Sequence, residues 1–115
     1  MLKKIHRLTS NRDFKLVFKD GRSFETEFIK LKIASNKKDV SRFGFIVSAK
    51  IAPKAHDRNL VKRRLRSAVR FLLPNIQSGF DVAIWPKAKV KGIEFQVLID
   101  SLKNLFKKSL IWQEI

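Results

Sequence analysis

Residues 57–73 read DRNLVKRRLRSAVRFLL and give the clearest structural signal in the chain. Asp57 is a suitable N-cap residue, and Pro74 disfavours helical geometry in the residue before it. The apolar residues of this stretch recur at helical spacing, namely Val61, Leu65, Ala68, Val69 and Leu72. The sequence therefore predicts one amphipathic helix over residues 57–73, whose apolar face packs on another element.

Strands are predicted on both sides of this helix. Residues 43–47 (FGFIV) form a near-continuous apolar run, which is typical of an inner strand. Residues 80–85 (FDVAIW) form a further strand that ends at Pro86. The chain thus contains a strand, a helix and a second strand in succession.

Residues 24–35 alternate between two faces, as a half-buried strand does. The first face is aliphatic and consists of Ile29, Leu31 and Ile33. The second face carries an aromatic ring and two cations, from Phe28, Lys30 and Lys32. The pattern also leaves room for a short extra strand near Phe24.

Helices are predicted near both ends of the chain. Residues 10–19, capped by Ser10 or Asn11, have one apolar face made of Phe14, Val17 and Phe18. Residues 94 to about 112 form a second amphipathic helix. The order α-β-β-α-β-α predicts an α+β fold, a two-layer α/β sandwich with a sheet of three or four strands, over one domain of residues 1–115.

Composition excludes several classes of protein. The 115 residues include 26 Lys and Arg against 10 Asp and Glu, a net charge of +16, yet 44% are hydrophobic, which is too apolar for a disordered basic tail. There is no Cys for a disulfide or thiolate site, and two separated His residues argue against a zinc site. No stretch is apolar enough for a membrane span or a signal peptide. We therefore expect a cytoplasmic protein with a polyanionic partner, nucleic acid, although a merely basic protein would have the same composition.

The predicted central helix carries a ridge of cations. Arg58, Lys62, Arg66 and Arg70 follow at four-residue steps, with Asn59 and Arg63 beside them. Like charges at this spacing destabilise a helix by a few tenths of a kcal/mol per pair, so the ridge favours a phosphate-binding role. The alternative is a solvated helix face. Such a face normally carries both acidic and basic residues, but no acidic residue occurs between Asp57 and Asp81.

A second set of residues suggests a groove for single-stranded RNA. If the first helix crosses the outer face of the alternating strand, it brings two rings, Phe14 and Phe18, to Phe28, Lys30 and Lys32. Aromatic rings stack on unpaired bases while cations follow the backbone. The alternative is that each Phe belongs to the core. We expect Trp85 to pack on the core at the end of its strand.

No arrangement of residues indicates catalysis by the protein itself. Ser48, His56 and Asp57 do not constitute a triad, no carboxylate pair has a recognisable spacing, and there is no phosphate-binding glycine loop. We expect His56 to pack or cap at the helix start. We therefore expect no catalytic residue and no metal site in this chain.

Three motifs resemble the bacterial ribonuclease P protein component. Residues 47–66 (VSAKIAPKAHDRNLVKRRLR) match its signature, and residues 13–23 (DFKLVFKDGRS) match the helix that follows its basic Arg-Leu segment, here Arg7-Leu8. Residues 42–48 (RFGFIVS) match the strand before the signature. The resemblance covers nearly the whole chain.

The resemblance implies a fold and a role. The family fold has a left-handed β-α-β crossover and is similar to the second domain of ribosomal protein S5. The partners implied are a large catalytic RNA and precursor tRNA, from which the holoenzyme removes the 5′ leader hydrolytically, with Mg²⁺ held mainly by the RNA. No membrane and no obligate protein partner are expected.

Residue roles follow from the same resemblance. The catalytic RNA would meet a set of polar and cationic residues, namely Lys50, Arg58, Asn59, Lys62, Arg63 and Arg66. The leader would meet the groove residues, namely Phe14, Phe18, Phe28, Lys30 and Lys32.

Two positions depart from the family pattern. Leu60 stands where the family has the second Arg of an Arg-Asn-Arg motif, so either one phosphate contact is missing or Arg64 supplies it. Ala49 stands where the family usually has the first Lys of a Lys pair. A structural RNA-binding protein of ribosomal type is the main alternative, since it needs the basic helix but no leader groove. A DNA-binding nucleoid protein is a third hypothesis, without a recognisable helix-turn-helix.

Overall fold

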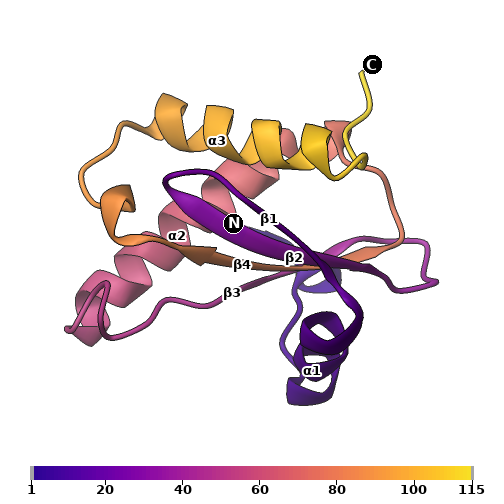
Figure 1. Cartoon of the computed structure of the whole chain (residues 1–115), viewed down its shortest axis with the longest axis horizontal. Coiled ribbons are helices and arrows are strands. Elements are labelled where there is room, and N and C mark those ends of the chain that lie inside the picture. The colour runs from indigo at the N-terminus through magenta and orange to yellow at the C-terminus, as the bar shows by residue number, and fades with distance from the viewer. Residues whose placement is uncertain (1, 115) are drawn as a thin grey trace.

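The computed structural model describes residues 2–114 and contains one four-stranded sheet with helices on both of its faces (Figure 1). The strands are β1 (Arg22–Glu25), β2 (Ile29–Ser35), β3 (Arg42–Phe45) and β4 (Phe80–Pro86). The α-helices are α1 (Asn11–Asp20), α2 (Ala55–Leu72) and α3 (Phe95–Lys108). Short 3-10 helices span Lys4–His6, Leu73–Asn75 and Ala88–Val90.

The sheet has the strand order β1-β2-β4-β3. β1 pairs antiparallel with β2, β2 pairs antiparallel with β4, and β3 pairs parallel with β4. Because β3 and β4 are parallel, the chain must cross over between them, and α2 is that connection. The predicted α+β class and the order of the elements are confirmed, with β1 as the extra short strand.

The predicted continuous strand over residues 24–35 is wrong in one respect, because a turn divides it into β1 and β2. The Thr26 hydroxyl accepts hydrogen bonds from the backbone N–H groups of Phe28 (3.2 Å) and Ile29 (3.3 Å), and the Thr26 N–H donates to the Ile29 carbonyl (2.9 Å). A threonine side chain stabilises such a turn by satisfying backbone donors locally. The two-residue alternation therefore begins afresh at Ile29.

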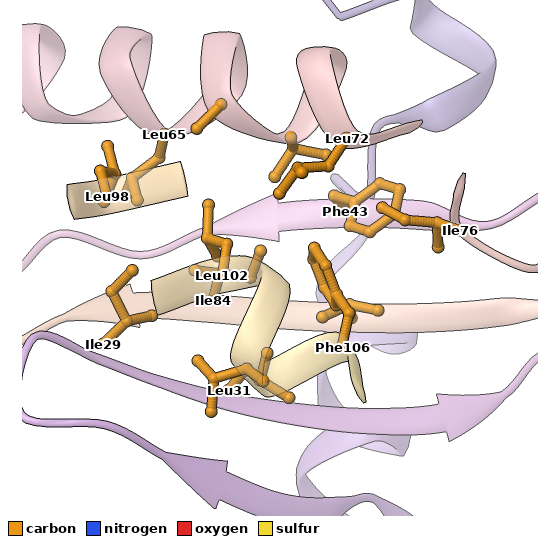
Figure 2. Packing of buried hydrophobic residues seen from close by; sticks show 14 of the residues in the cluster. Ile29, Leu31, Phe43, Leu65, Leu72, Ile76, Ile84, Leu98, Leu102 and Phe106 are labelled. Atoms are coloured by element: carbon orange, nitrogen blue, oxygen red, sulfur yellow. The ribbon is translucent and has the colours of Figure 1, made fainter. Parts of the chain in front are cut away.

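The main core lies between the sheet and the layer formed by α2 and α3 (Figure 2). Ile29, Leu31 and Ile33 point into it, as their alternation predicts, and each is at most 1% exposed. From α2, Leu65, Ala68, Val69 and Leu72 are buried, whereas Val61 is half-buried. Burial of each large aliphatic side chain stabilises the fold by roughly 1.5–3 kcal/mol.

Both long helices have ends that differ from the predicted ones. α2 begins at Ala55, so Asp57 lies in its first turn rather than at the N-cap, where its charge still favours the helix dipole. α3 ends at Lys108 because the Ser109 hydroxyl donates to the Leu105 carbonyl (2.8 Å) and Leu110 has a left-handed φ of 66°. Trp112 instead forms an isolated β-bridge with Ile76.

α1 lies on the opposite face of the sheet from α2 and α3 (Figure 1). Ser10 caps it, as expected, by accepting a hydrogen bond from the Asp13 N–H (3.5 Å). Val17 packs with Leu8 and Ala83 in a second, small core. α1 covers part of this face and leaves the rest open.

Arg42 fastens α1 to the sheet. Its guanidinium donates to both carboxylate oxygens of Asp81 on β4 (2.8 and 2.6 Å) and to Asp13 on α1 (3.2 Å). The hydrogen bond with Asp81 raises the pKa of Arg42 above its ordinary value. This three-residue contact positions the N-terminal end of α1 over β3 and β4.

Candidate nucleic-acid interface

The open part of the α1 face carries a surface of neighbouring rings and cations, which we call the aromatic groove; it consists of Phe14, Phe18, Trp85, Lys30 and Lys32. The Phe14 and Phe18 rings have centroids 6.3 Å apart and are nearly parallel, and the Phe18 and Trp85 centroids are 5.9 Å apart with the rings tilted by 61°. Phe18 is 41% exposed. The groove therefore offers a row of three neighbouring rings, and a ring of this exposure is available to stack on a base.

Two lysines of β2 border the row of rings. Lys30 is opposite Trp85 in the register of β2 and β4, and its ammonium lies 5.6 Å from the Trp85 ring centroid. The Lys32 ammonium donates to the Phe18 carbonyl in the last turn of α1 (2.9 Å). The structure thus brings four of the five predicted groove residues together.

Phe28 is the exception, and its predicted place on the outer face is wrong. Phe28 precedes β2, in the bend that follows Thr26, and its side chain packs against the main core. It lines a pocket near α3 together with Val97 and Ser101. The turn breaks the alternation that the prediction extended back from Lys30, so the ring lies on the other face of the sheet.

Trp85 is a groove residue that the sequence pattern did not reveal. It does pack against a core, as expected, but this is the small core under α1, and the indole remains partly exposed beside Phe18 and Lys30. Alternation along β4 could have revealed it, because Asp81 and Ala83 share its face. The apolar neighbours Val82 and Ile84 obscured that alternation.

Close approach of α1 to the sheet depends on Gly44. A Cβ atom at this position would overlap the Phe14 ring and would lie 2.9 Å from the Leu8 carbonyl oxygen. Glycine at this point of β3 lets the Phe14 ring lie directly on the strand. The groove therefore extends to the β3 edge of the sheet.

The predicted cationic ridge is present on α2, and its members differ in how they are held. Arg58 donates to the carbonyls of Ala52 (3.0 Å) and Pro53 (2.7 Å), so it also braces the loop before the helix. The Arg66 guanidinium lies 5.9 Å from the Phe45 ring centroid. Lys62 is half-buried and Arg70 is exposed.

Asn59 and Arg63 are exposed beside the ridge and share a pocket with Arg66 and Ser67. Lys50 is exposed in the turn that leads to α2. Asn59, Arg63 and Lys50 are therefore accessible to a partner.

The ridge and the groove meet at a cavity of about 220 Å³. Its lining includes Arg7 and Thr9 from the N-terminal segment, Lys62 and Arg66 from α2, and Phe14 from α1. Arg7 is held there by a β-bridge to Phe43, which places the N-terminal segment along the β3 edge. One continuous surface of cations and rings thus joins α2 to the groove.

The two departures from the family pattern are both at the surface. Leu60 is 42% exposed, and Ala49 lies exposed in the turn beside Lys50. The Arg64 guanidinium donates to the Ile93 carbonyl in the loop before α3. This hydrogen bond directs the Arg64 side chain toward the loop before α3.

The acidic side chains do not gather into a metal site. Within residues 2–114, no group of three or more His, Asp or Glu side chains is arranged to hold a metal ion. Several carboxylates pair with cations instead; Lys87, for example, donates to Glu25 (2.6 Å) and thereby lowers the pKa of this carboxyl. No helix in this part of the chain is long and apolar enough to cross a membrane.

These features define the class of protein. A small α+β domain joins a cationic helix to a groove of aromatic rings and lysines, which is the chemistry of a protein that binds single-stranded and structured nucleic acid.

Comparison with known proteins identifies the family within this class. The family model described as Ribonuclease P matches residues 2–110, and the chain belongs to this family. The ribonuclease P protein component of Picosynechococcus sp. is 35% identical over 104 residues, which are 90% of this chain and 90% of that protein.

Solved structures agree with this assignment. The ribonuclease P protein from Thermotoga maritima matches with a TM-score of 0.81 at 35% identity, over 89% of this chain and 96% of that one. The Staphylococcus aureus ribonuclease P protein matches with a TM-score of 0.83 at 25% identity, over 94% and 98%. The expected fold and the main functional interpretation, a ribonuclease P protein component, are thereby confirmed.

Proposed function

We propose that this chain is a single RNA-binding domain that pairs with the catalytic RNA of a cytoplasmic ribonuclease P and promotes removal of the 5′ leader from precursor tRNA. α2 and the turn before it dock on the catalytic RNA, through Lys50, Arg58, Asn59, Lys62, Arg63 and Arg66. The groove holds the leader in extended form, between Phe14, Phe18, Lys30 and Lys32. Phe28 is not part of this assignment because its ring faces the main core.

The observation that carries the proposal is the continuity of the two surfaces. Phe14 shares a cavity with Lys62 and Arg66, and no acidic residue lines this cavity, so an RNA strand that leaves α2 can reach the first ring through it. A structural RNA-binding protein needs the cationic helix but has no use for exposed rings. The exposed Phe18 ring therefore favours the leader-binding function over that alternative.

The chemistry in this proposal belongs to the RNA. Mg²⁺ ions held by the RNA supply the activated water and stabilise the leaving oxygen. Within residues 2–114 no three His, Asp or Glu side chains are grouped to hold a metal ion. Asp13 and Asp81 form ion pairs with Arg42, and Glu25 forms one with Lys87. The protein contributes by binding and orienting the substrate, with no obligate protein partner.

The test is cleavage of precursor tRNA by a bacterial ribonuclease P RNA at low magnesium, with and without this protein. We expect the protein to stimulate cleavage at the mature 5′ end and to be inactive alone. Tight RNA binding without stimulation would support the structural RNA-binding protein instead. Equal affinity for duplex DNA and for the RNA would support a nucleoid protein.

A further inference from the structure

Trp85 and Lys30 form a distinct end to the groove. We propose that they make an additional nucleotide subsite, in which an unpaired RNA base stacks on the Trp85 indole and the Lys30 ammonium contacts the adjoining phosphate. The inference rests on the proposed function, because it requires that the groove hold a single strand. The inference adds Trp85, which is not among the leader-binding residues predicted from the sequence.

The geometry of Trp85 suits a stacking role. The Trp85 side chain is partly exposed and packs against the small core under α1, so its position is held before any ligand arrives. Phe18 lies 5.9 Å away with its ring tilted by 61°, which supports the indole from the side. A base stacked on a fixed ring loses little free energy to ordering of the protein.

Lys30 provides the matching charge. Its ammonium lies 5.6 Å from the Trp85 centroid and is opposite it in the strand register. At a surface site an ammonium over a ring is a weak contact, and a stacked base is a stronger one. We therefore infer that an arriving base displaces the ammonium, which then turns toward the phosphate on a flexible four-carbon chain.

The subsite lies at the end of the row of rings. Phe14, at the other end, shares the cavity with Lys62 and Arg66 of α2, whereas Trp85 is reached through Phe18. A leader that starts beside α2 therefore meets Trp85 last. Stacking accepts any base, so the subsite adds affinity for a longer leader and no sequence preference.

The chain has two tryptophans, and this makes the proposal directly testable. Trp112→Phe leaves Trp85 as the single fluorescent reporter, and Trp112 lies outside the groove, in a bridge to Ile76. The single-tryptophan protein is assembled with ribonuclease P RNA and titrated with precursor tRNA or with mature tRNA. We expect the precursor to quench Trp85 emission and mature tRNA to leave it nearly unchanged.

A second measurement uses affinity. Trp85→Ala should weaken precursor binding about tenfold and leave mature tRNA binding unchanged, whereas Trp85→Phe should retain most of the affinity. Thermal unfolding of both variants checks that the small core survives the substitution. Shortening the leader in steps should remove the difference between wild type and Trp85→Ala once the distal nucleotide is absent.

Each outcome separates the subsite from the proposed function. If the protein stimulates cleavage and Phe18→Ala weakens precursor binding, but Trp85 emission does not respond to the leader, the subsite is absent and the function stands. If the protein does not stimulate cleavage at all, the proposed function itself fails. Equal quenching by precursor and mature tRNA would place a different part of the RNA at Trp85 and overturn the inference.

Discussion

At the scale of single residues, the groove depends on a contrast between buried and exposed rings. Phe43 and Phe106 are at most 1% exposed, with centroids 6.2 Å apart, and they stabilise the main core. Phe18 also has aromatic neighbours, yet 41% of it is open to solvent. A partly exposed ring contributes less to folding than a buried one, which agrees with the proposal that Phe18 serves binding.

Phe18→Ala should therefore separate binding from stability. We expect the affinity for leader-bearing precursor to fall by about 1–3 kcal/mol, because one base no longer has its stacking partner. Binding of mature tRNA should not change, and unfolding in urea should shift little. The measurement is equilibrium binding of both RNAs to the reconstituted complex. An equal fall for precursor and mature tRNA would contradict a leader groove.

At the scale of elements, α2 packs with one face and presents polar and cationic side chains on another. Its aliphatic residues Leu65, Val69 and Leu72 are buried, while Arg63 and Asn59 face solvent. Arg58 is intermediate, since it also holds the two carbonyls of the preceding loop. A substitution at Arg58 would therefore mix a structural effect with a binding effect, and Lys62 and Arg63 are better probes.

Charge reversal on α2 should change the salt dependence of RNA binding. With Lys62→Glu and Arg63→Glu, we expect the slope of log K against log salt to fall by about 0.7–0.9 for each phosphate that the protein no longer neutralises. The measurement is affinity for ribonuclease P RNA at several salt concentrations. Each substitution is also made alone. Lys108→Glu, which reverses one charge at an exposed position of α3, is the control for these single variants. An unchanged slope in the α2 variants would exclude this surface as the docking site.

The attachment of α1 to the sheet is a second property of elements. Arg42→Met should destabilise the protein by about 1–3 kcal/mol, because Asp81, which is 6% exposed, would be left without its charged partner. Urea unfolding measures the change in the free energy of unfolding. Asp81→Asn in the Arg42→Met background should recover part of it by removing the buried charge. Full stability of the single variant would show that the contacts of Arg42 with Asp13 and Asp81 do not stabilise the fold.

At the scale of the whole molecule, the positive net charge destabilises the folded state and favours binding of a polyanion. The net charge of +16 repels itself in a body with a radius of gyration of 13.1 Å. The described ion pairs connect neighbouring elements, for example Lys87 with Glu25, but cations remain in large excess. Binding of a polyanion relieves this repulsion and stabilises the folded state by mass action.

The melting temperature should accordingly rise with ionic strength. Screening shortens the range of repulsion to about 10 Å at 0.1 M salt, so we expect a higher Tm as sodium chloride is increased from low concentration. Sulfate should act at lower concentration than chloride if anions bind at the cationic surface. Calorimetry measures both effects. A Tm that falls with added salt would show that the ion pairs outweigh the repulsion.

Local patterns were sufficient to predict the helices, most of the strands and the cationic ridge. The spacing of apolar residues shows which face of a helix is buried. This spacing can be read from residues that are close together in the sequence. Ser10 as the cap of α1 and the buried stripe of α2 are both local in this sense. Helix ends were less predictable, because the Ser109 hydroxyl and the bridge from Trp112 to Ile76 decide where α3 ends.

The sequence by itself determined the α+β class, the charge and the family, because these depend on composition and on residues at short spacing. Tertiary structure alone decided which rings form the groove. Phe28 lies outside it because the Thr26 turn restarts the strand alternation, and Trp85 belongs to it because β4 pairs with β2 in a register that places the indole opposite Lys30. Strand register brings together residues that are distant along the chain, and no local pattern specifies such a pairing.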